Sequence, residues 1–301
     1  NIGINLGATA GAGIAEHLGL KTQVVVKFIA PDLANKPEAA ARFEREAASA
    51  AQVKSPHVVQ VLDHGLNPVH GPYIVMELLE GQDLGAYLKA HGRLPAREVG
   101  AMIAQVARAL SKAHALSIVH RDIKPDNIFL CDADGGEVFV KLLDFGIAKA
   151  DDRIGTGTTT GQVMGTPYYM SPEQLLGEHI DTRTDIWSLG VVAYEALTGK
   201  RPFKGETIGA LTLSIHSPPP SADKWIPHPP PGFDAWFARV CSKNRDERFA
   251  SARDAAQALY ELCEAAPVEP KHVFVDRALV ERADLTSAPT LPCAGSPADA
   301  N

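Results

Sequence analysis

The octapeptide at residues 120–127, His-Arg-Asp-Ile-Lys-Pro-Asp-Asn, decides how the rest of this chain is interpreted. It is a short polar loop between apolar flanks. An amphipathic helix is predicted before it at 95–116, because apolar residues recur there at helical spacing. A short hairpin is predicted after it, ending at the tripeptide Asp-Phe-Gly, residues 144–146. The loop and the tripeptide are therefore expected to lie close together.

The polar residues of these two segments suit one kind of chemistry. Mg²⁺ prefers oxygen ligands, which the carboxylate of Asp144 and the amide oxygen of Asn127 provide. Asp122 is able to accept a hydroxyl proton, and Lys124 is able to neutralise charge on a moving phosphoryl group. Singly, such residues are more often caps or turn formers. In combination they favour phosphoryl transfer.

Composition restricts the class of protein. The 301 residues are 45% hydrophobic and 22% charged, which indicates a folded chain with either one two-lobed domain or two small ones. A net charge of -7 without clustered Lys and Arg argues against nucleic-acid binding. Four scattered cysteines predict a cytoplasmic, reducing location. We expect neither a membrane segment nor a signal peptide, because no apolar run approaches ~20 residues.

The first eighty residues predict the order strand, helix, strand, strand, at 21–29, 38–53, 55–63 and 72–79. Lys27 interrupts an apolar strand, so it is either a solvated edge residue or a buried lysine with an anionic partner. Glu46, on the following helix, is a candidate partner. The Gly-rich residues 1–19 form either a phosphate-binding loop or a flexible arm.

The larger remainder is predicted to be mainly helical. Its expected elements lie at 95–116, 128–130, 138–143, 185–197, 233–242 and 252–264, with Gly199 ending the fourth. The Thr-rich segment 151–165 is expected to be mobile. The Pro-rich segment 217–232 is either a rigid surface connection or a ligand for a proline-binding module. Residues 265–301 are expected to form a disordered Pro/Ala-rich tail.

Taken together, these motifs resemble those of the eukaryotic-like serine/threonine protein kinases of bacteria, over roughly residues 7–264. The resemblance is carried by Val24–Lys27, Arg45-Glu46, the 120–127 loop, Asp144–Gly146, Gly165-Thr166-Pro167, Ser171-Pro172-Glu173 and Asp185–Ser188. It implies an α+β, two-lobed protein-kinase fold. An N-lobe with a small antiparallel sheet and one helix would occupy residues 1–80, with a short or truncated first strand, and a mainly helical C-lobe would occupy 81–264.

The resemblance also implies roles for individual residues, with ATP and Mg²⁺ as cosubstrates. Asp122 would be the catalytic base, Lys124 would lie near the γ-phosphate, and Asn127 and Asp144 would bind magnesium. The implied ATP-binding residues are Gly7, Lys27 with its partner Glu46, the gatekeeper Met76, the hinge from Glu77 to Leu79, and Phe129.

Further implied roles concern regulation and folding. Arg121 would dock a phosphorylated activation-loop residue, for which Thr158 and Thr160 are the candidates unless the loop is merely flexible. Thr166 would contact the catalytic loop and shape the substrate groove. Glu173 and Arg248 would form a buried structural ion pair.

The glycine-rich loop departs from the family pattern. Only Gly7 remains of the glycines expected there, and Asn5, Ala10 and Ala12 stand at the other positions. Three functions are therefore weighed: an active serine/threonine protein kinase, a pseudokinase or scaffold with little turnover, and a small-molecule kinase of the aminoglycoside type. The expected partners are protein substrates and a second copy of the kinase for autophosphorylation.

Overall fold

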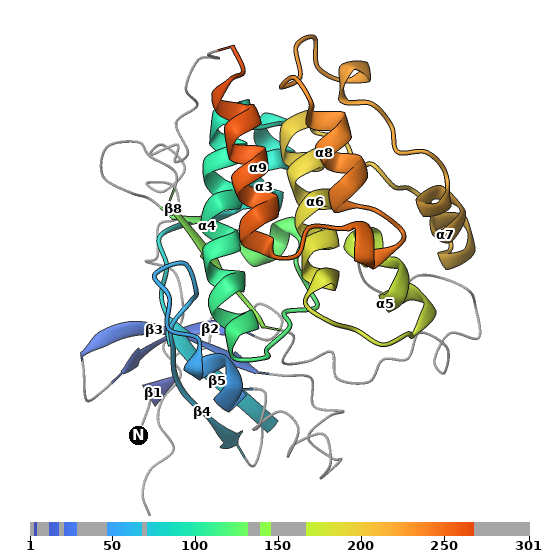
Figure 1. Cartoon of the computed structure of the whole chain (residues 1–301). Coiled ribbons are helices and arrows are strands. Elements are labelled where there is room, and N and C mark those ends of the chain that lie inside the picture. Colours follow the sequence, from blue (N-terminus) through green and yellow to red (C-terminus); the bar gives the residue numbers. More distant parts are fainter. Residues whose placement is uncertain are drawn as a thin grey trace, which may run out of the picture.

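The computed structural model describes residues 3–4, 12–17, 21–28, 47–67, 71–131, 139–145 and 167–267. Within these residues, an antiparallel sheet forms a small lobe at one end of the molecule, and helices form most of a larger lobe (Figure 1). The expected division into a small β lobe and a larger helical lobe is confirmed. None of the helices within these residues is long and apolar enough to cross a bilayer.

The small lobe is built on a five-stranded sheet in the order β1-β2-β3-β5-β4. Its strands are β1 (Gly3–Ile4), β2 (Ala12–His17), β3 (Thr22–Phe28), β4 (Val61–Asn67) and β5 (Gly71–Glu77). Alternation along β3 buries Val24 and Val26 against Val75 of β5. Within the described residues β1 contains two residues, and the short or truncated first strand stays a prediction, because residues 1–2 and 5–11 lie outside them.

One predicted strand is wrong in its first half. Residues 55–60 do not join the small-lobe sheet as a strand, and β4 begins only at Val61. Pro56 has no N–H to donate, and the N–H of His57 turns back to the Ser55 hydroxyl. Residues 57–59 instead bond to Leu142 of the larger lobe, which accepts from Val59 and donates to His57. This short segment thus ties the two lobes together.

A second sheet lies between the small lobe and the helices. It contains β6 (Gly81–Asp83), β7 (Ile128–Cys131) and β8 (Phe139–Leu142), in that order. The predicted hairpin of β7 and β8 is confirmed, whereas β6 was not predicted. Gly81 of β6 has φ +133°, and a Cβ there would lie 2.0 Å from the carbonyl oxygen of Leu130. Only glycine allows this close approach of the two strands.

The larger lobe is formed by helices around the buried helix α6. The helices are α3 (Leu84–His91), α4 (Ala96–Ala115), α5 (Pro172–Leu176), α6 (Arg183–Thr198), α7 (Ile208–His216), α8 (Phe233–Val240) and α9 (Ala252–Glu264). Helix α4 lies along α9, and α6 lies between α4 and α8 (Figure 1). Gly190 of α6 permits close packing on α8, because a Cβ there would lie 2.4 Å from Val240.

Most of the long helices agree with their predicted ranges, and three shorter helices were not predicted. Helix α6 ends at Gly199, whose φ is +69°, as expected of a glycine C-cap. Helices α3, α5 and α7 are the missed ones. The Pro-rich segment 217–232 contains no strand or α-helix, only one 3-10 turn at Ala222–Lys224. The predicted mobile segment 151–165 and most of the predicted tail lie outside the described residues.

Candidate active site

The backbone of the 120–127 loop is held by one buried carboxylate. Asp185, at the start of α6, is fully buried. Its Oδ2 accepts from the backbone N–H of His120 at 2.9 Å, and its Oδ1 accepts from that of Arg121, also at 2.9 Å. Arg121 has φ +66°, a conformation that is unfavourable for a non-glycine residue. These two charge-assisted bonds therefore stabilise a strained turn immediately before Asp122.

The ring of His120 connects the loop to the segment that carries Asp144. Its Nε2 lies 2.8 Å from the carbonyl oxygen of Leu143, and its Nδ1 lies 3.3 Å from the backbone nitrogen of Asp122. The ring also packs on Phe145, with centroids 4.7 Å apart. Complete burial holds the pKa of His120 below its usual value, against the opposing effect of Asp185. A neutral ring that donates from Nε2 and accepts at Nδ1 satisfies both contacts.

Asp122, Lys124 and Asn127 converge in the loop. The Oδ2 of Asp122 lies 3.2 Å from Lys124 Nζ and accepts from Asn127 Nδ2 at 3.0 Å. Asn127 Nδ2 also donates to the backbone oxygen of Asp122, at 2.8 Å. The carboxylate is thus oriented by two neighbours within its own loop. The amide oxygen of Asn127 remains as the acceptor that Mg²⁺ prefers.

Lys27 of β3 and Asp144, just after β8, form an ion pair between the lobes. The N–H of Leu143 donates to the Asn127 carbonyl at 2.8 Å, so Asp144 follows a residue bound to the loop. The pair of Lys27 with Glu46 stays a prediction, because Glu46 lies outside the described residues. A cation and a carboxylate from different lobes therefore meet beside the loop.

The predicted hinge connects the two lobes, and the side chain of Glu77 holds it through contacts with Gln60 and Lys141. Met76 and Glu77 end β5, where they pair with β3, and Leu79 follows in the connection to β6. The Oε1 of Glu77 accepts from the backbone nitrogen of Gln60 at 2.7 Å and from Lys141 Nζ of β8 at 2.6 Å. Phe129 of β7 pairs in register with Lys141.

The roles of Lys141 and Asp185 were not predicted from the sequence. Both are charged residues within apolar segments, in β8 and at the start of α6. A charge in such a place usually has a partner, so the pattern held a signal. It did not identify the partner, because Glu77 and the 120–121 amides are far away in the chain.

The predicted pair of Glu173 and Arg248 is confirmed as a contact. Arg248 Nη1 donates to Glu173 Oε1 at 2.7 Å, and Nη2 donates to Oε2 at 2.9 Å. Both side chains are buried, and Thr184 also donates to Oε1. Burial alone would raise the pKa of Glu173, but the hydrogen bonds and charge of Arg248 hold it at about 2. The pair therefore holds α5 against the segment that precedes α9.

The remaining predicted residues are not all described. Arg121 has an exposed side chain, and its carbonyl accepts from Gln174 at 2.8 Å. Gly7, Thr158, Thr160 and Thr166 lie outside the described residues, so their roles stay predictions.

Comparison with known proteins agrees with this geometry. Residues 6–260 match the protein kinase domain family. The serine/threonine-protein kinase Pkn1 of Myxococcus xanthus is 39% identical over 247 residues, which is 81% of this chain and 35% of that protein. The serine/threonine-protein kinase PknA of Mycobacterium tuberculosis is 42% identical over 232 residues, 73% of this chain and 52% of that protein.

Solved structures give the same result. The crystal structure of the Mycobacterium tuberculosis PknI kinase domain has a TM-score of 0.68 and 27% identity, covering 87% of this chain and 96% of that one. The chain spans about a third to a half of the length of Pkn1 and PknA. The match over residues 6–260 and these identities place the chain in the protein kinase family, among relatives that are bacterial serine/threonine-protein kinases.

Proposed function

We propose that this chain is an active serine/threonine protein kinase that transfers the γ-phosphoryl group of ATP to Ser or Thr hydroxyls of proteins. The observation that carries the proposal is the oriented carboxylate of Asp122, whose Oδ2 is contacted by both Lys124 and Asn127. A carboxylate held in this way is suited to accept the proton of an attacking hydroxyl. The chain's relatives carry the same activity in their names.

The other side chains would bind the phosphates and the metal ion. Lys124 would lie against the transferred group, and Lys27 would exchange its contact with Asp144 for the phosphates of ATP. Asn127 and Asp144 present an amide oxygen and a carboxylate, which fit a Mg²⁺ ion. The metal, when bound, neutralises developing charge on the phosphates. His120 and Asp185 act only by positioning the backbone of the loop.

The test is phosphoryl transfer by the purified chain with labelled ATP and Mg²⁺. In Asp122→Asn the shape is kept and the proton acceptor is lost, so we expect kcat to fall about 10²- to 10⁴-fold. Asp223→Asn is a matched control, because Asp223 is exposed in the larger lobe. Transfer by Asp122→Asn at the wild-type rate would contradict the assignment.

A second measurement separates binding from turnover. Mg-ATP at 100 times its Kd should stabilise the folded chain by about 2.7 kcal/mol. Binding without any transfer, in the wild type, would favour the scaffold instead. That alternative rests on the glycine-poor segment around Gly7, which lies outside the described residues. The lobe boundaries at 80 and 264, a cytoplasmic location and a homodimer for autophosphorylation stay predictions.

A further inference from the structure

Two adjoining hollows lie on the larger lobe beside the catalytic loop. One, of about 430 Å³, is lined by the end of α6 and the segment after it, and the other is about 510 Å³. They share Glu195, Gly199 and Arg201. The second reaches Pro125 and Asp126, which lie between Lys124 and Asn127 in the loop. A polypeptide that presents a hydroxyl to Asp122 therefore has these hollows within reach of its neighbouring residues.

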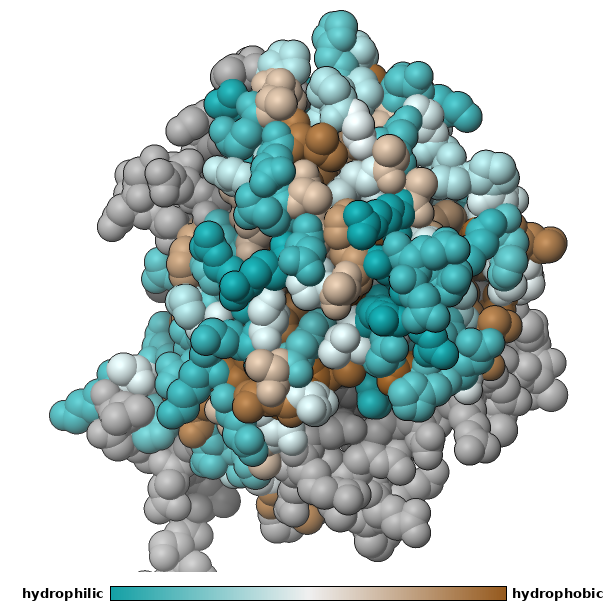
Figure 2. Space-filling model, viewed as in Figure 1, coloured by the Kyte–Doolittle hydropathy of each residue, from teal (hydrophilic) through white to brown (hydrophobic). Residues whose placement is uncertain are grey.

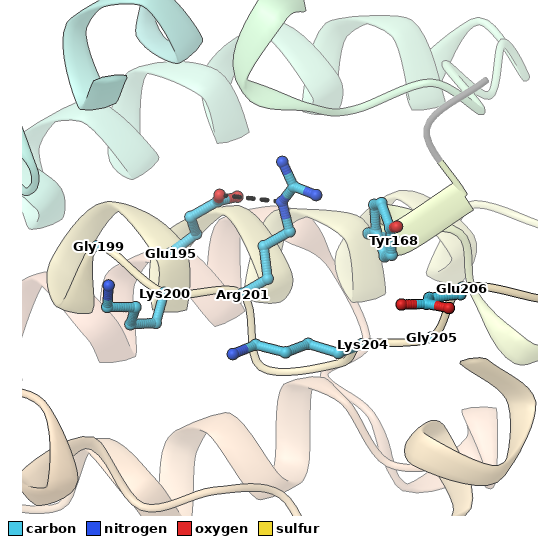
Figure 3. A pocket seen from close by; sticks show the side chains of 8 residues that line it. All are labelled: Tyr168, Glu195, Gly199, Lys200, Arg201, Lys204, Gly205 and Glu206. Atoms are coloured by element: carbon cyan, nitrogen blue, oxygen red, sulfur yellow. Dashed lines mark hydrogen bonds and ion pairs between the residues drawn. The ribbon is translucent and has the colours of Figure 1, made fainter. Parts of the chain in front are cut away.

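Arg201 lines the first hollow and lies between Glu195 and Tyr168 (Figure 3). Its Nε lies 3.3 Å from Glu195 Oε1, and its guanidinium lies 4.6 Å from the centre of the Tyr168 ring. Glu195 is mostly buried and also accepts from the Tyr169 hydroxyl. Burial and the Glu195 charge raise the pKa of Tyr169, so its hydroxyl keeps the proton that it donates. The guanidinium is thus preorganised rather than mobile.

The charges around Arg201 favour a negative ligand. Lys200 and Lys204 line the same hollow, and within the described residues neither forms an ion pair. The Lys204 ammonium lies 5.6 Å from the centre of the Trp225 ring, and the side chain is exposed. This cation–π contact places the charge without neutralising it. The acids of this hollow are Glu195, already paired with Arg201, and Glu206. The Arg201–Glu195 pair sums to zero, so the remaining charges are the two lysines and Glu206, and the hollow carries one net positive charge.

Figure 3 shows which part of Arg201 is left for a ligand. Nε is directed at Glu195, and the guanidinium also interacts with the Tyr169 hydroxyl. The remaining N–H donors of the terminal nitrogens are left for a ligand. Arginine binds a carboxylate through parallel N–H donors, which is the geometry that terminal nitrogens offer. The side chain is 41% exposed, so a ligand can approach it from solvent.

We propose that this hollow is a specificity subsite that binds an acidic side chain, Asp or Glu, of the polypeptide substrate, with Arg201 as the recognising group and Lys204 beside it. The proposal rests on the proposed kinase function and deepens it. It predicts that a carboxylate at one position near the phosphorylated residue raises kcat/KM mainly through KM, because the contact is remote from the reacting atoms.

The test uses the full chain and peptides with one Ser or Thr acceptor in a neutral background. Each flanking position is changed in turn to Glu, Ala or Lys, and kcat/KM is measured. A charge-assisted hydrogen bond predicts that Glu exceeds Lys by about tenfold or more at one position. Arg201→Gln and Lys204→Glu should each bring this ratio towards one. Arg253→Glu on α9 is the matched control and should keep the wild-type ratio, because Arg253 is exposed and does not line either hollow.

The outcomes are distinct. If the wild type phosphorylates the peptides with no position that favours Glu, the subsite is overturned and the kinase function stands. If the preference persists in both Arg201→Gln and Lys204→Glu, the assignment of the hollow is also overturned. Lys204→Glu remains informative should Arg201→Gln be poorly folded, since Lys204 contacts only the Trp225 ring among the contacts described above. Absence of transfer to any acceptor would contradict the kinase function itself.

Discussion

Replacement of Glu173 by Gln should destabilise the larger lobe strongly. Gln has nearly the same volume, so the packing is retained while the charge opposite Arg248 disappears. Arg248 is 3% exposed, and its two terminal nitrogens now donate to Glu173 at 2.7 and 2.9 Å. Removing one partner of such a buried pair costs about 3–5 kcal/mol, because the other charge is left without compensation.

The effect is measured by thermal unfolding followed by circular dichroism. A loss of about 3–5 kcal/mol in the free energy of unfolding corresponds to a fall in Tm of about 6 to 20 °C for a chain of this length. A double variant, Glu173→Leu with Arg248→Met, should recover much of the loss, because apolar residues of similar volume leave no buried charge. The control is Glu247→Gln, an exposed acid in the same region. A fall in Tm below about 2 °C for Glu173→Gln would refute the reasoning.

Three further predictions concern Glu173, Asp185 and Lys141. Because the pKa of Glu173 is lowered from 4.5 to about 2 on folding, its contribution is complete above pH 4.5. It is lost as the pH falls towards 2, by about 3 kcal/mol, and acid titration of unfolding should show this loss in the wild type and not in Glu173→Gln. Asp185→Asn should lower kcat, because in either orientation its amide nitrogen would face one backbone N–H of the 120–121 turn. The unsatisfied N–H would destabilise that turn by about 1–3 kcal/mol. Steady-state kinetics with an unchanged kcat would contradict this. Lys141→Met removes the ion-pair partner of the predicted hinge residue Glu77, so KM for ATP should rise, whereas the exposed control Lys54→Met should leave KM unchanged; an unchanged KM in Lys141→Met would contradict this.

Long helices were predictable from the sequence because their evidence is local. Helices α4 and α9 agree closely with the predicted ranges 95–116 and 252–264, since apolar residues recur at helical spacing along each. Helix α7 was missed because its sequence mixes Gly209 with Thr and Ser and exposes apolar residues such as Leu213. Its polar and apolar residues therefore do not separate clearly onto two faces.

The error at residues 55–63 has a different cause. The segment is rich in β-branched residues, which is the usual sign of a strand. Residues 57–59 do make strand-like hydrogen bonds, but to Leu142 of the other lobe rather than to the small-lobe sheet. Propensity indicates that a backbone is extended and gives no information on which distant strand it meets.

The sequence alone determined the chemical groups of this protein: Asp122, Lys124, Asn127 and Asp144, in an order and spacing that predict a catalytic loop and a metal-binding segment after it. Only the tertiary structure decided how these groups are held. The buried Asp185 fixes the turn before Asp122, Lys141 is paired with Glu77 across the lobes, and Arg201 stands over Tyr168 beside the loop. The physical reason is that a motif specifies residues close together in the chain. The partner of a buried charge lies far away in the chain and is selected by packing, because desolvation makes an unpaired charge unfavourable wherever it is buried.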